Sequence, residues 1–414
     1  MVKYLNAFLA SLEGSCRCLR VKNGGEAIGG HEILRQMSSP VSSRTVSLAS
    51  PRLKSVDVFR GATIVAMILV NGQFSNEDSY RQFAHAAWDG WTFADTIYPC
   101  FLFIVGVSIT LSTSSRVARG EGSTRLLGHA LQRSLVIFGC GVVIDYLRFP
   151  AHEFPFVGLQ AHLQFTGVLQ KIAVCYLVAF CIHLWSGLRG VIVGIISLNL
   201  LYLGLLYFYP VPGCGPGSLT ASCNFPNYLD EIVLDGFRWN STSFDPDGVG
   251  AIFPAITSVL FGVLAGEILR IERRSWQRFL WLLGAGIVLN GTGELLAAWV
   301  PINKQLWTSS FAVFMAGLAA TGLAFFIWLV DRRPSQDWFR PLEIFGSNAV
   351  AAYLISRLVT NVPRVHIMGK SLYTDFLARI ASPPNASLLF AIVVLAAVFL
   401  VVWMMDRRGW HLSI

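Results

Sequence analysis

Ten long apolar segments run through this sequence and constrain its fold more than any other feature. A helix needs about 20 mostly apolar residues to cross a bilayer, and each segment has roughly that length. We therefore expect an all-α protein, a polytopic transmembrane helix bundle of about ten spanning helices. The expected spans cover residues 56–73, 94–113, 131–149, 165–185, 190–210, 250–270, 278–299, 308–330, 342–361 and 385–405.

The connections between these segments alternate in their content of basic residues. Basic residues mark cytoplasmic loops in membrane proteins, and ten spans with both termini in the cytoplasm satisfy this rule along the chain. The formal charge of +8 then reflects topology, and we expect a lipid bilayer and no nucleic acid as partner. The arginines that carry the pattern are Arg116, Arg119, Arg125, Arg133, Arg189, Arg270, Arg273, Arg274, Arg278, Arg332, Arg333, Arg340, Arg407 and Arg408.

The composition excludes two other classes of protein. Hydrophobic residues make up 54% of the chain and charged residues only 14%, whereas soluble domains carry about 25% charged residues. Intrinsic disorder needs low hydrophobicity and high net charge, so it is excluded for most of the chain. Only residues 1–50, which are polar and rich in serine, fit a disordered cytoplasmic tail, and residues 51–414 form the predicted membrane domain.

Ionisable and amide side chains inside membrane spans are costly and are candidates for function. On the first span, Asp57, Arg60 and Asn71 lie near one helical line at 100° per residue. An ion pair between Asp57 and Arg60 explains those two residues without a function. For Asn71, a functional role and a hydrogen bond to another helix are equally compatible with the sequence. Further polar groups within spans are Asp145, Lys171, Glu267, Asn290, Glu294, Asn348 and Arg357.

The segment before the second span, HAAWDG at residues 85–90, is the richest in chemistry. If it is helical, His85, Trp88 and Asp89 share one face. A histidine works as a base or nucleophile near neutral pH, and a carboxylate fixes its tautomer. An interfacial tryptophan belt with an incidental histidine explains the same residues without catalysis.

The cysteines and the remaining motifs narrow the chemistry further. Cys214 and Cys223 lie in the long connection 211–248, where a disulfide and two free thiols are both compatible with the sequence. The sequence has no HExxH pattern and no Cys/His array with metal-ligand spacing, so we expect no metal. It also lacks a Walker phosphate loop and a GxSxG elbow. His85 is therefore the best candidate for a catalytic side chain.

Several motifs together resemble one known family, the transmembrane acyltransferases typified by heparan-α-glucosaminide N-acetyltransferase. The resemblance covers residues 52 to about 360, with the motifs in the family's order, and it implies a bacterial-type member in the cytoplasmic membrane. The matching motifs are SVDVFRG (55–61) with Val70-Asn71, HAAWDG (85–90), GVLQKIA (167–173), FDPDG (244–248), PINK (301–304) with Leu306-Trp307, and FGSN (345–348).

The resemblance implies an enzyme that moves acetyl from cytoplasmic acetyl-CoA to a sugar amine or hydroxyl on the other side of the membrane. It maps the family's essential histidine to His85 and an asparagine to Asn71. We expect His85 to act as general base or to carry the acetyl group itself, with Asp89 or Asp95 fixing the imidazole. Asn71 is expected to face the thioester oxygen or to orient the acceptor.

Other residues are expected to support the site or bind its substrates. Asp57 and Arg60 are supporting residues in this hypothesis. Lys171 either reaches the pyrophosphate of acetyl-CoA or, as we prefer, pairs with a buried carboxylate. The expected contacts of the glycan or glycolipid acceptor are Trp88, Asn303, Lys304 and Glu294, and those of acetyl-CoA are Lys171 and Asn348.

Alternatives to this hypothesis remain open at the level of sequence. A small-solute or lipid transporter without acyltransferase activity accommodates the intramembrane charges, but the chain shows no repeat with matching broken helices. A membrane scaffold leaves the polar face that includes Asn71 unexplained. A homodimer is compatible with the sequence, which carries no information on oligomeric state.

Overall fold

A computed structural model describes residues 53–74, 77–146, 165–234, 244–272, 274–332, 337–361, 377, 379 and 381–410. All of them belong to the compact unit Ala49–Ile414. The predicted tail, residues 1–50, lies outside the described residues, so its assignment stays a prediction.

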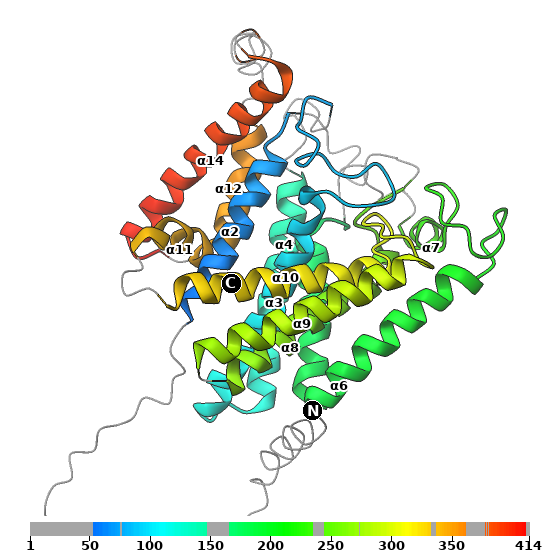
Figure 1. Cartoon of the computed structure of the whole chain (residues 1–414), viewed down its shortest axis with the longest axis horizontal. Coiled ribbons are helices and arrows are strands. Elements are labelled where there is room, and N and C mark those ends of the chain that lie inside the picture. The colour runs from blue at the N-terminus through cyan, green and yellow to red at the C-terminus, as the bar shows by residue number, and fades with distance from the viewer. Residues whose placement is uncertain are drawn as a thin grey trace, which may run out of the picture. The chain divides into compact units, whose positions relative to one another are not determined.

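The regular structure of the described residues is helical (Figure 1). The only strand-like pairings among them are two isolated bridges, Gly90 with Asn303 and Val211 with Gly215. The all-α prediction is therefore confirmed. The elements are α2 (Lys54–Asn71), α3 (Phe93–Ala118), α4 (Ser123–Tyr146), α6 (Val168–Phe208), α7 (Phe225–Val233), η3 (Val249–Ala251), α8 (Ile252–Ile271), α9 (Ser275–Ala297), α10 (Ser309–Val330), η4 (Asp337–Phe339), α11 (Arg340–Ser347), α12 (Ala349–Asn361) and α14 (Pro383–Arg407).

Seven described helices are long and apolar enough to cross a membrane: α3, α4, α6, α8 with η3, α9, α10 and α14. The bent pair formed by η4–α11 and α12, with 76° between its halves, raises the number to eight if it is one span. Helix α2 is outside this set and carries Lys54, Asp57 and Arg60 in its first two turns. The structure thus supports seven or eight spans. The number of about ten spans and the location of both termini in the cytoplasm stay predictions.

One long helix occupies two of the predicted spans. Helix α6 covers the segments predicted at 165–185 and 190–210 and is broken at Gly187, whose φ is 58°. Glycine adopts positive φ without the steric penalty that a Cβ atom imposes. The local kink therefore separates two apolar halves that the sequence presents as two segments.

The interior of the bundle is built on α3, α8 and α10, whose side chains are mostly buried. Helices α3 and α8 cross closely, because a Cβ atom on Gly106 would collide with Val259 O and one on Gly262 with Phe103 O. Thr110 ties the same pair by donating a hydrogen bond to Val263 O over 3.1 Å. Small residues allow this close approach of two helix backbones within a membrane.

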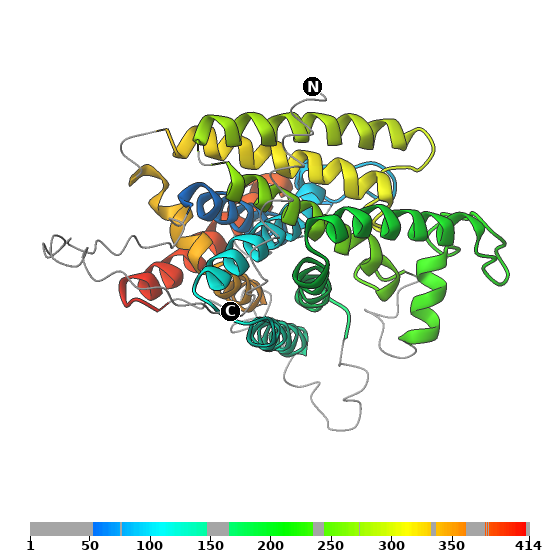
Figure 2. The same ribbon diagram turned by 90° about the horizontal axis from the view of Figure 1, so that it is seen from below.

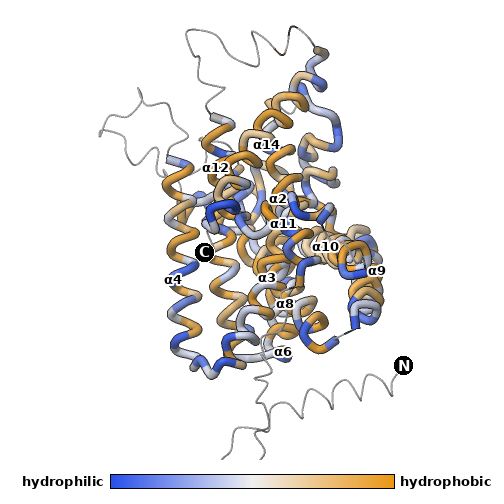
Figure 3. The backbone as a smooth tube through the Cα atoms, turned by 90° about the vertical axis from the view of Figure 1, so that its left-hand side faces the viewer, coloured by the Kyte–Doolittle hydropathy of each residue, from blue (hydrophilic) through white to orange (hydrophobic). Residues whose placement is uncertain are grey.

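The peripheral helices present apolar side chains outward. Helices α9 and α10 lie side by side, and α4 lies on the opposite side of the bundle (Figure 2). Apolar residues extend along α4 and α14 (Figure 3). Large exposed hydrophobic residues such as Leu135, Val143, Ile287 and Val288 fit a surface in contact with lipid tails.

Candidate active site

The segment that carries His85 is a loop that leads into α3. Residues 85–90 form bends and irregular backbone, and α3 begins at Phe93. The segment is therefore not helical, and the condition under which His85, Trp88 and Asp89 would share a helical face is not met. Gly90 has φ of 91°, a left-handed conformation that glycine tolerates, and it turns the chain before the helix starts.

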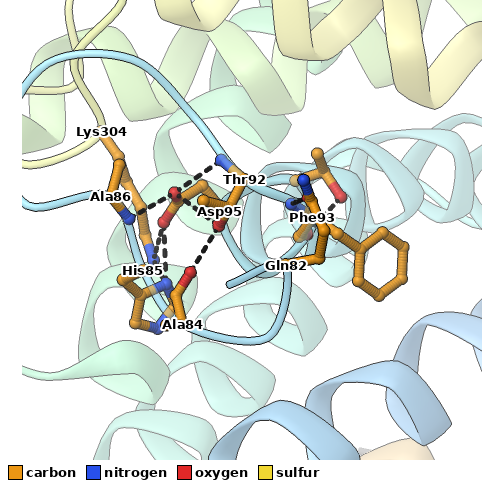
Figure 4. A network of polar contacts seen from close by, with 9 residues as sticks. Gln82, Ala84, His85, Ala86, Thr92, Phe93, Asp95 and Lys304 are labelled. Carbon is orange, nitrogen blue, oxygen red and sulfur yellow. Dashed lines mark hydrogen bonds and ion pairs between the residues drawn. The ribbon is translucent and has the colours of Figure 1, made fainter. Parts of the chain in front are cut away.

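Asp95 holds the imidazole of His85 (Figure 4). Its Oδ1 lies 2.7 Å from Nδ1 of the ring. Its Oδ2 accepts hydrogen bonds from the backbone N–H groups of Ala86 and Thr92, each over 3.0 Å. Thr92 and Asp95 form a capping box at the start of α3, and such a box satisfies N–H groups that have no partner within the helix. One oxygen of Asp95 thus fixes the helix end and the other orients the histidine.

Lys304 completes the cluster from the loop between α9 and α10 (Figure 4). Its Nζ lies 3.1 Å from Asp95 Oδ1 and 3.0 Å from His85 Nδ1. Burial lowers the pKa of Lys304, although the charge of Asp95 acts in the opposite direction. A carboxylate only accepts, so the 2.7 Å contact between Asp95 Oδ1 and Nδ1 requires the proton on Nδ1. With this tautomer Lys304 donates to Asp95 and not to the ring.

Two further hydrogen bonds connect the loop that contains Lys304 to the loop that contains His85. Gly90 N donates to Ile302 O over 2.7 Å, and Asn303 Nδ2 donates to Asp89 Oδ1 over 3.1 Å. Asn303 is fully buried, and its Oδ1 accepts from Leu306 N. Asn303 and Asp89 therefore join the two loops, and neither lines a described cavity.

His85 lines a cavity of about 330 Å³, here called the histidine cavity. Its Nδ1–H donates to Asp95, and its Nε2 has no hydrogen bond to a described residue, which leaves Nε2 available to a substrate. Asn71, at the end of α2, lines the same cavity. The other residues of its wall are Met67, Val70, Ala94, Ile97, Tyr98, Asp145, Thr166, Gly167, Val168, Asp245, Pro246, Asp247, Lys304, Gln305, Trp307, Tyr353 and Arg357.

The carboxylates of the histidine cavity have partners within the protein. Asp145 Oδ2 accepts a hydrogen bond from Gln170 Nε2 over 2.9 Å. Asp245 Oδ2 accepts one from the Thr166 hydroxyl over 2.7 Å. Burial raises the pKa of Asp247.

Lys171 lies next to Asp247 of this cavity and is almost completely buried. Its Nζ is 3.9 Å from Asp247 Oδ1 and 4.6 Å from the centre of the Trp307 ring. The preferred pairing of Lys171 with a buried carboxylate matches this contact. Lys171 does not line either described cavity, so the structure does not bring it to a place where it would meet a cofactor.

A second, larger cavity of about 620 Å³, the basic cavity, lies further along the same helices. Its wall includes Arg60, Arg116, His129 and Arg133. Helices α2, α3, α4, α6 and α12 line both cavities, and on α3 Tyr98 faces one cavity and Phe101 the other. The two cavities therefore follow one another along the bundle.

The remaining predicted site residues lie outside the His85 cluster. Asp57 and Arg60 form the expected ion pair, 2.9 Å long, at the basic cavity. Glu294 is exposed on α9 and lines neither described cavity, because that face of α9 points away from the interior. Asn348 ends α11 and is buried beside the basic cavity, where its Nδ2 donates to Ile344 O.

The long connection between α6 and η3 is joined to the His85 loop. Cys214 and Cys223 form a disulfide with Cα atoms 5.7 Å apart. Trp88 Nε1 donates to Leu219 O, within the disulfide loop, over 2.9 Å. The Trp88 ring packs edge-on against Phe244. Trp88 thus anchors this loop and does not line the described cavities, although it was predicted to bind substrate.

Sequence reasoning missed several residues of this site. The TxxD spacing of Thr92 and Asp95 before an apolar run is a recognisable capping signal, and it would have favoured Asp95 over Asp89 as the partner of His85. Tyr353 and Arg357 reach the cavity from a helix more than 260 positions further along the chain, and no local pattern indicates that. The part of the chain that the structure describes holds no cluster of metal-binding side chains.

Comparison with known proteins gives one consistent family. Residues 52–282 match the family described as heparan-alpha-glucosaminide N-acetyltransferase, catalytic. The human heparan-alpha-glucosaminide N-acetyltransferase is 30% identical over 342 residues, which are 69% of this chain and 49% of the human protein. The mouse protein of the same name is 28% identical over 382 residues, covering 78% of this chain and 56% of the mouse protein. The chain thus spans about half the length of the curated relatives it matches.

Proposed function

The chain belongs to the heparan-α-glucosaminide N-acetyltransferase catalytic family, and from this premise we propose that it is a membrane acetyltransferase. Its donor in this proposal is acetyl-CoA, and its acceptor is an amine or hydroxyl of a sugar. The observation that carries the proposal is the geometry at His85. An imidazole held by a buried carboxylate lines a cavity, and a basic cavity follows along the same helices.

His85 acts as general base in the simplest mechanism. With Nδ1–H donating to Asp95, Nε2 has the lone pair that takes the proton of the acceptor as its nitrogen or oxygen attacks the thioester carbonyl. The carbon–sulfur bond then breaks, and the imidazolium returns the proton to the CoA thiolate. Asp95 stabilises the positive charge that the ring carries between the two steps.

Asn71 supplies a polar group to the same cavity, from the end of α2. In the proposal, its amide N–H donates to the carbonyl oxygen that becomes negative during the attack. A second route has Nε2 attack the thioester itself, so that His85 carries the acetyl group before the acceptor takes it. Trapping of labelled acetyl on His85 in the absence of acceptor distinguishes this route from direct transfer.

The donor enters through the basic cavity in this proposal. The phosphates of CoA carry several negative charges, and the cavity wall offers Arg60, Arg116 and Arg133. Arg133 Nε is buried without a hydrogen-bond partner in the described structure, so this guanidinium retains a donor for a phosphate oxygen. The pantetheine arm then extends along α3, from Ser108 past Phe101 to Tyr98, and brings the thioester to His85.

The two cavities support a cytoplasmic donor and an acceptor from the other side. Arg116 of the basic cavity lies in the last turn of α3, at the end that the positive-inside rule places in the cytoplasm. Contacts between Phe103 and Gly262 and between Val107 and Gly266 show that α3 and α8 run parallel, so Arg270 lies at the same end as Arg116. The acceptor then reaches the histidine cavity from the disulfide-closed loop side, which fits an oxidising compartment.

The proposal is tested by acetyl transfer with purified protein in detergent. Wild-type protein and His85→Ala are given acetyl-CoA labelled in the acetyl group and a panel of amino sugars and neutral sugars, and label in the sugar is measured. We expect transfer by the wild type and a loss of at least 100-fold in His85→Ala, since general acid–base catalysis contributes about 10²–10⁴-fold. His183→Ala is the matched control, because His183 on α6 lines neither cavity; equal activity of His85→Ala and wild type contradicts the proposal.

A further inference from the structure

Arg357 is the charged residue of the histidine cavity for which the described residues provide no hydrogen-bond or ion-pair partner. It lies on α12 and lines the cavity together with His85 and Asn71. No hydrogen bond or ion pair joins Arg357 to any of the described residues. The carboxylates of the same wall are engaged elsewhere, Asp145 by Gln170, Asp245 by Thr166 and Asp247 by Lys171 at 3.9 Å.

A charged arginine without a partner among the described residues destabilises a helix that spans a membrane. The bent pair that contains α12 is long and apolar enough to span a membrane, and charged side chains in such helices are rare unless they pair or serve a function. A guanidinium keeps its charge at all physiological pH values and offers five N–H donors but no acceptor. Arg357 therefore needs an anion, and the described protein supplies none within ion-pair distance.

The position of Arg357 along α12 indicates which substrate supplies the anion. Ala349 and Val350 on this helix line the basic cavity, whereas Tyr353 and Arg357 line the histidine cavity. At a rise of 1.5 Å per residue, Arg357 lies about 12 Å along the axis from Ala349. The acetyl thioester, which is the end of the donor that reaches His85, is uncharged. A charge that meets Arg357 therefore comes from the acceptor.

We propose that Arg357 forms an anion subsite for the acceptor, which carries a carboxylate, phosphate or sulfate near the group that is acetylated. This inference rests on the proposed acetyl transfer at His85. A planar guanidinium binds such oxyanions through two parallel hydrogen bonds. In this role, Arg357 selects acidic sugars over neutral ones and sets their orientation toward Nε2 of His85.

The kinetic test compares acceptors that differ only in the anionic group. Glucosamine, glucosamine 6-phosphate and glucosamine 6-sulfate are given to the wild type, Arg357→Gln and Arg357→Lys. We expect the wild type to prefer the anionic sugars. Arg357→Gln should lose about 10- to 100-fold in kcat/KM for them, because it loses hydrogen bonds to a charged group. Arg357→Lys should recover part of the loss. The neutral sugar should change less than threefold.

Several outcomes of this experiment overturn the inference. One is a wild type without preference for anionic acceptors, and another is an equal loss for neutral and anionic acceptors in Arg357→Gln. A rise in the KM of acetyl-CoA with an unchanged KM of the acceptor assigns Arg357 to a donor phosphate instead. Arg340→Gln is the matched control, because Arg340 pairs with Asp406 at the surface, outside both cavities.

A binding measurement separates this inference from the proposed function. Thermal stabilisation by glucosamine 6-phosphate and by inorganic phosphate is measured for wild type, His85→Ala and Arg357→Gln. Stabilisation of the first two proteins but not of Arg357→Gln supports the anion subsite, even if acetyl transfer is never observed. Equal stabilisation of all three overturns the subsite while leaving acetyl transfer at His85 intact.

Discussion

Asp95 is the residue on which the geometry of the candidate active site depends. It is 1% exposed, it closes the first turn of α3, and it bonds the imidazole of His85. Because the helix end fixes one carboxylate oxygen, the other oxygen has little freedom to move. The fold thus orients the histidine through a helix cap, and the cap and the site share one side chain.

Replacing Asp95 with asparagine tests whether the carboxylate fixes the tautomer of His85 while also capping α3. The asparagine oxygen can still accept the hydrogen bonds of Ala86 and Thr92, and its amide N–H₂ then faces Nδ1 of His85. Nδ1 becomes an acceptor and Nε2 carries the proton, which is the wrong tautomer for a base. We expect acetyl transfer to fall by about 10²- to 10⁴-fold with a small change in melting temperature.

Asp89→Asn is the control for this substitution, since Asp89 contacts Asn303 and not the imidazole. Its activity should stay within about tenfold of the wild type. Full activity of Asp95→Asn rules out a role for the carboxylate in fixing the tautomer.

At this scale the sequence indicated the histidine but not all of its surroundings. His85 stands out because of its residue type and motif. Its contact with Lys304 joins positions 219 residues apart, and only the folded chain brings them together. Glu294 was expected to bind the acceptor because of its residue type, but the rotation of α9 leaves its side chain exposed.

The crossing of α3 and α8 is the element-level feature that holds the cavity walls in place. Gly106 and Gly262 let the two backbones touch, and α3 carries Asp95 at its first turn. Gly262→Ala should destabilise the protein by about 1–3 kcal/mol or more, because its methyl group meets the backbone carbonyl of Phe103 and overpacking strains such contacts.

Thermal melting in detergent measures this effect against a matched glycine. Gly284→Ala on α9 adds a methyl group with no atom within 4 Å, and alanine favours a helix by up to about 1 kcal/mol over glycine. Its melting temperature should stay the same or rise. Similar melting temperatures for Gly262→Ala and wild type contradict the close crossing.

The packing of α7 against η3 gives a dependence of stability on pH. Asp230 on α7 accepts a hydrogen bond from Gly250 N over 3.1 Å, and its Oδ2 is buried without a partner in the described structure. Burial raises the pKa of Asp230 to about 6, from 3.8. The protonated form is therefore favoured by the fold, and this stabilisation is lost as the pH rises from about 4 through 6.

Asp230→Asn removes this dependence. At pH 8 the wild type holds a buried charge that costs roughly 3 kcal/mol at 1.36 kcal/mol for each pH unit between the two pKa values. We expect the variant to be more stable than the wild type at pH 8, and the difference to be about half as large at pH 5, because the loss begins near pH 4; melting temperature measures both. A difference between variant and wild type that is the same at both pH values contradicts the raised pKa.

The helices themselves were largely predictable from the sequence. Every predicted apolar segment overlaps a described helix, because apolar length alone identifies a bilayer-crossing helix. The kink at Gly187 and the bend between α11 and α12 could not be predicted in the same way, since hydropathy does not report the angle between two halves of an apolar segment. The loop conformation at 85–90 was missed because the spacing of three residues fits a helix as well as a bend.

At the scale of the whole membrane unit, the account depends on two cavities that follow one another along the same five helices. One has arginines in its wall and the other has His85. A donor and an acceptor that approach from opposite ends meet at the imidazole without either crossing the bundle. Hydropathy predicts the helices of such an arrangement but not the cavities between them, which depend on how side chains from five helices pack.

The most direct test of the central claim is acetyl transfer across a sealed membrane. Purified protein is reconstituted in liposomes with an amino sugar trapped inside, labelled acetyl-CoA is added outside, and label in the trapped sugar is counted for wild type and His85→Ala. The orientation of the protein is determined by protease access to the connection between α3 and α4, which contains Arg119. The account predicts labelled sugar inside the liposomes only for wild-type molecules whose arginine-rich end faces the donor, and none for His85→Ala. Labelling by His85→Ala contradicts it, and so does labelling only when donor and sugar share one compartment.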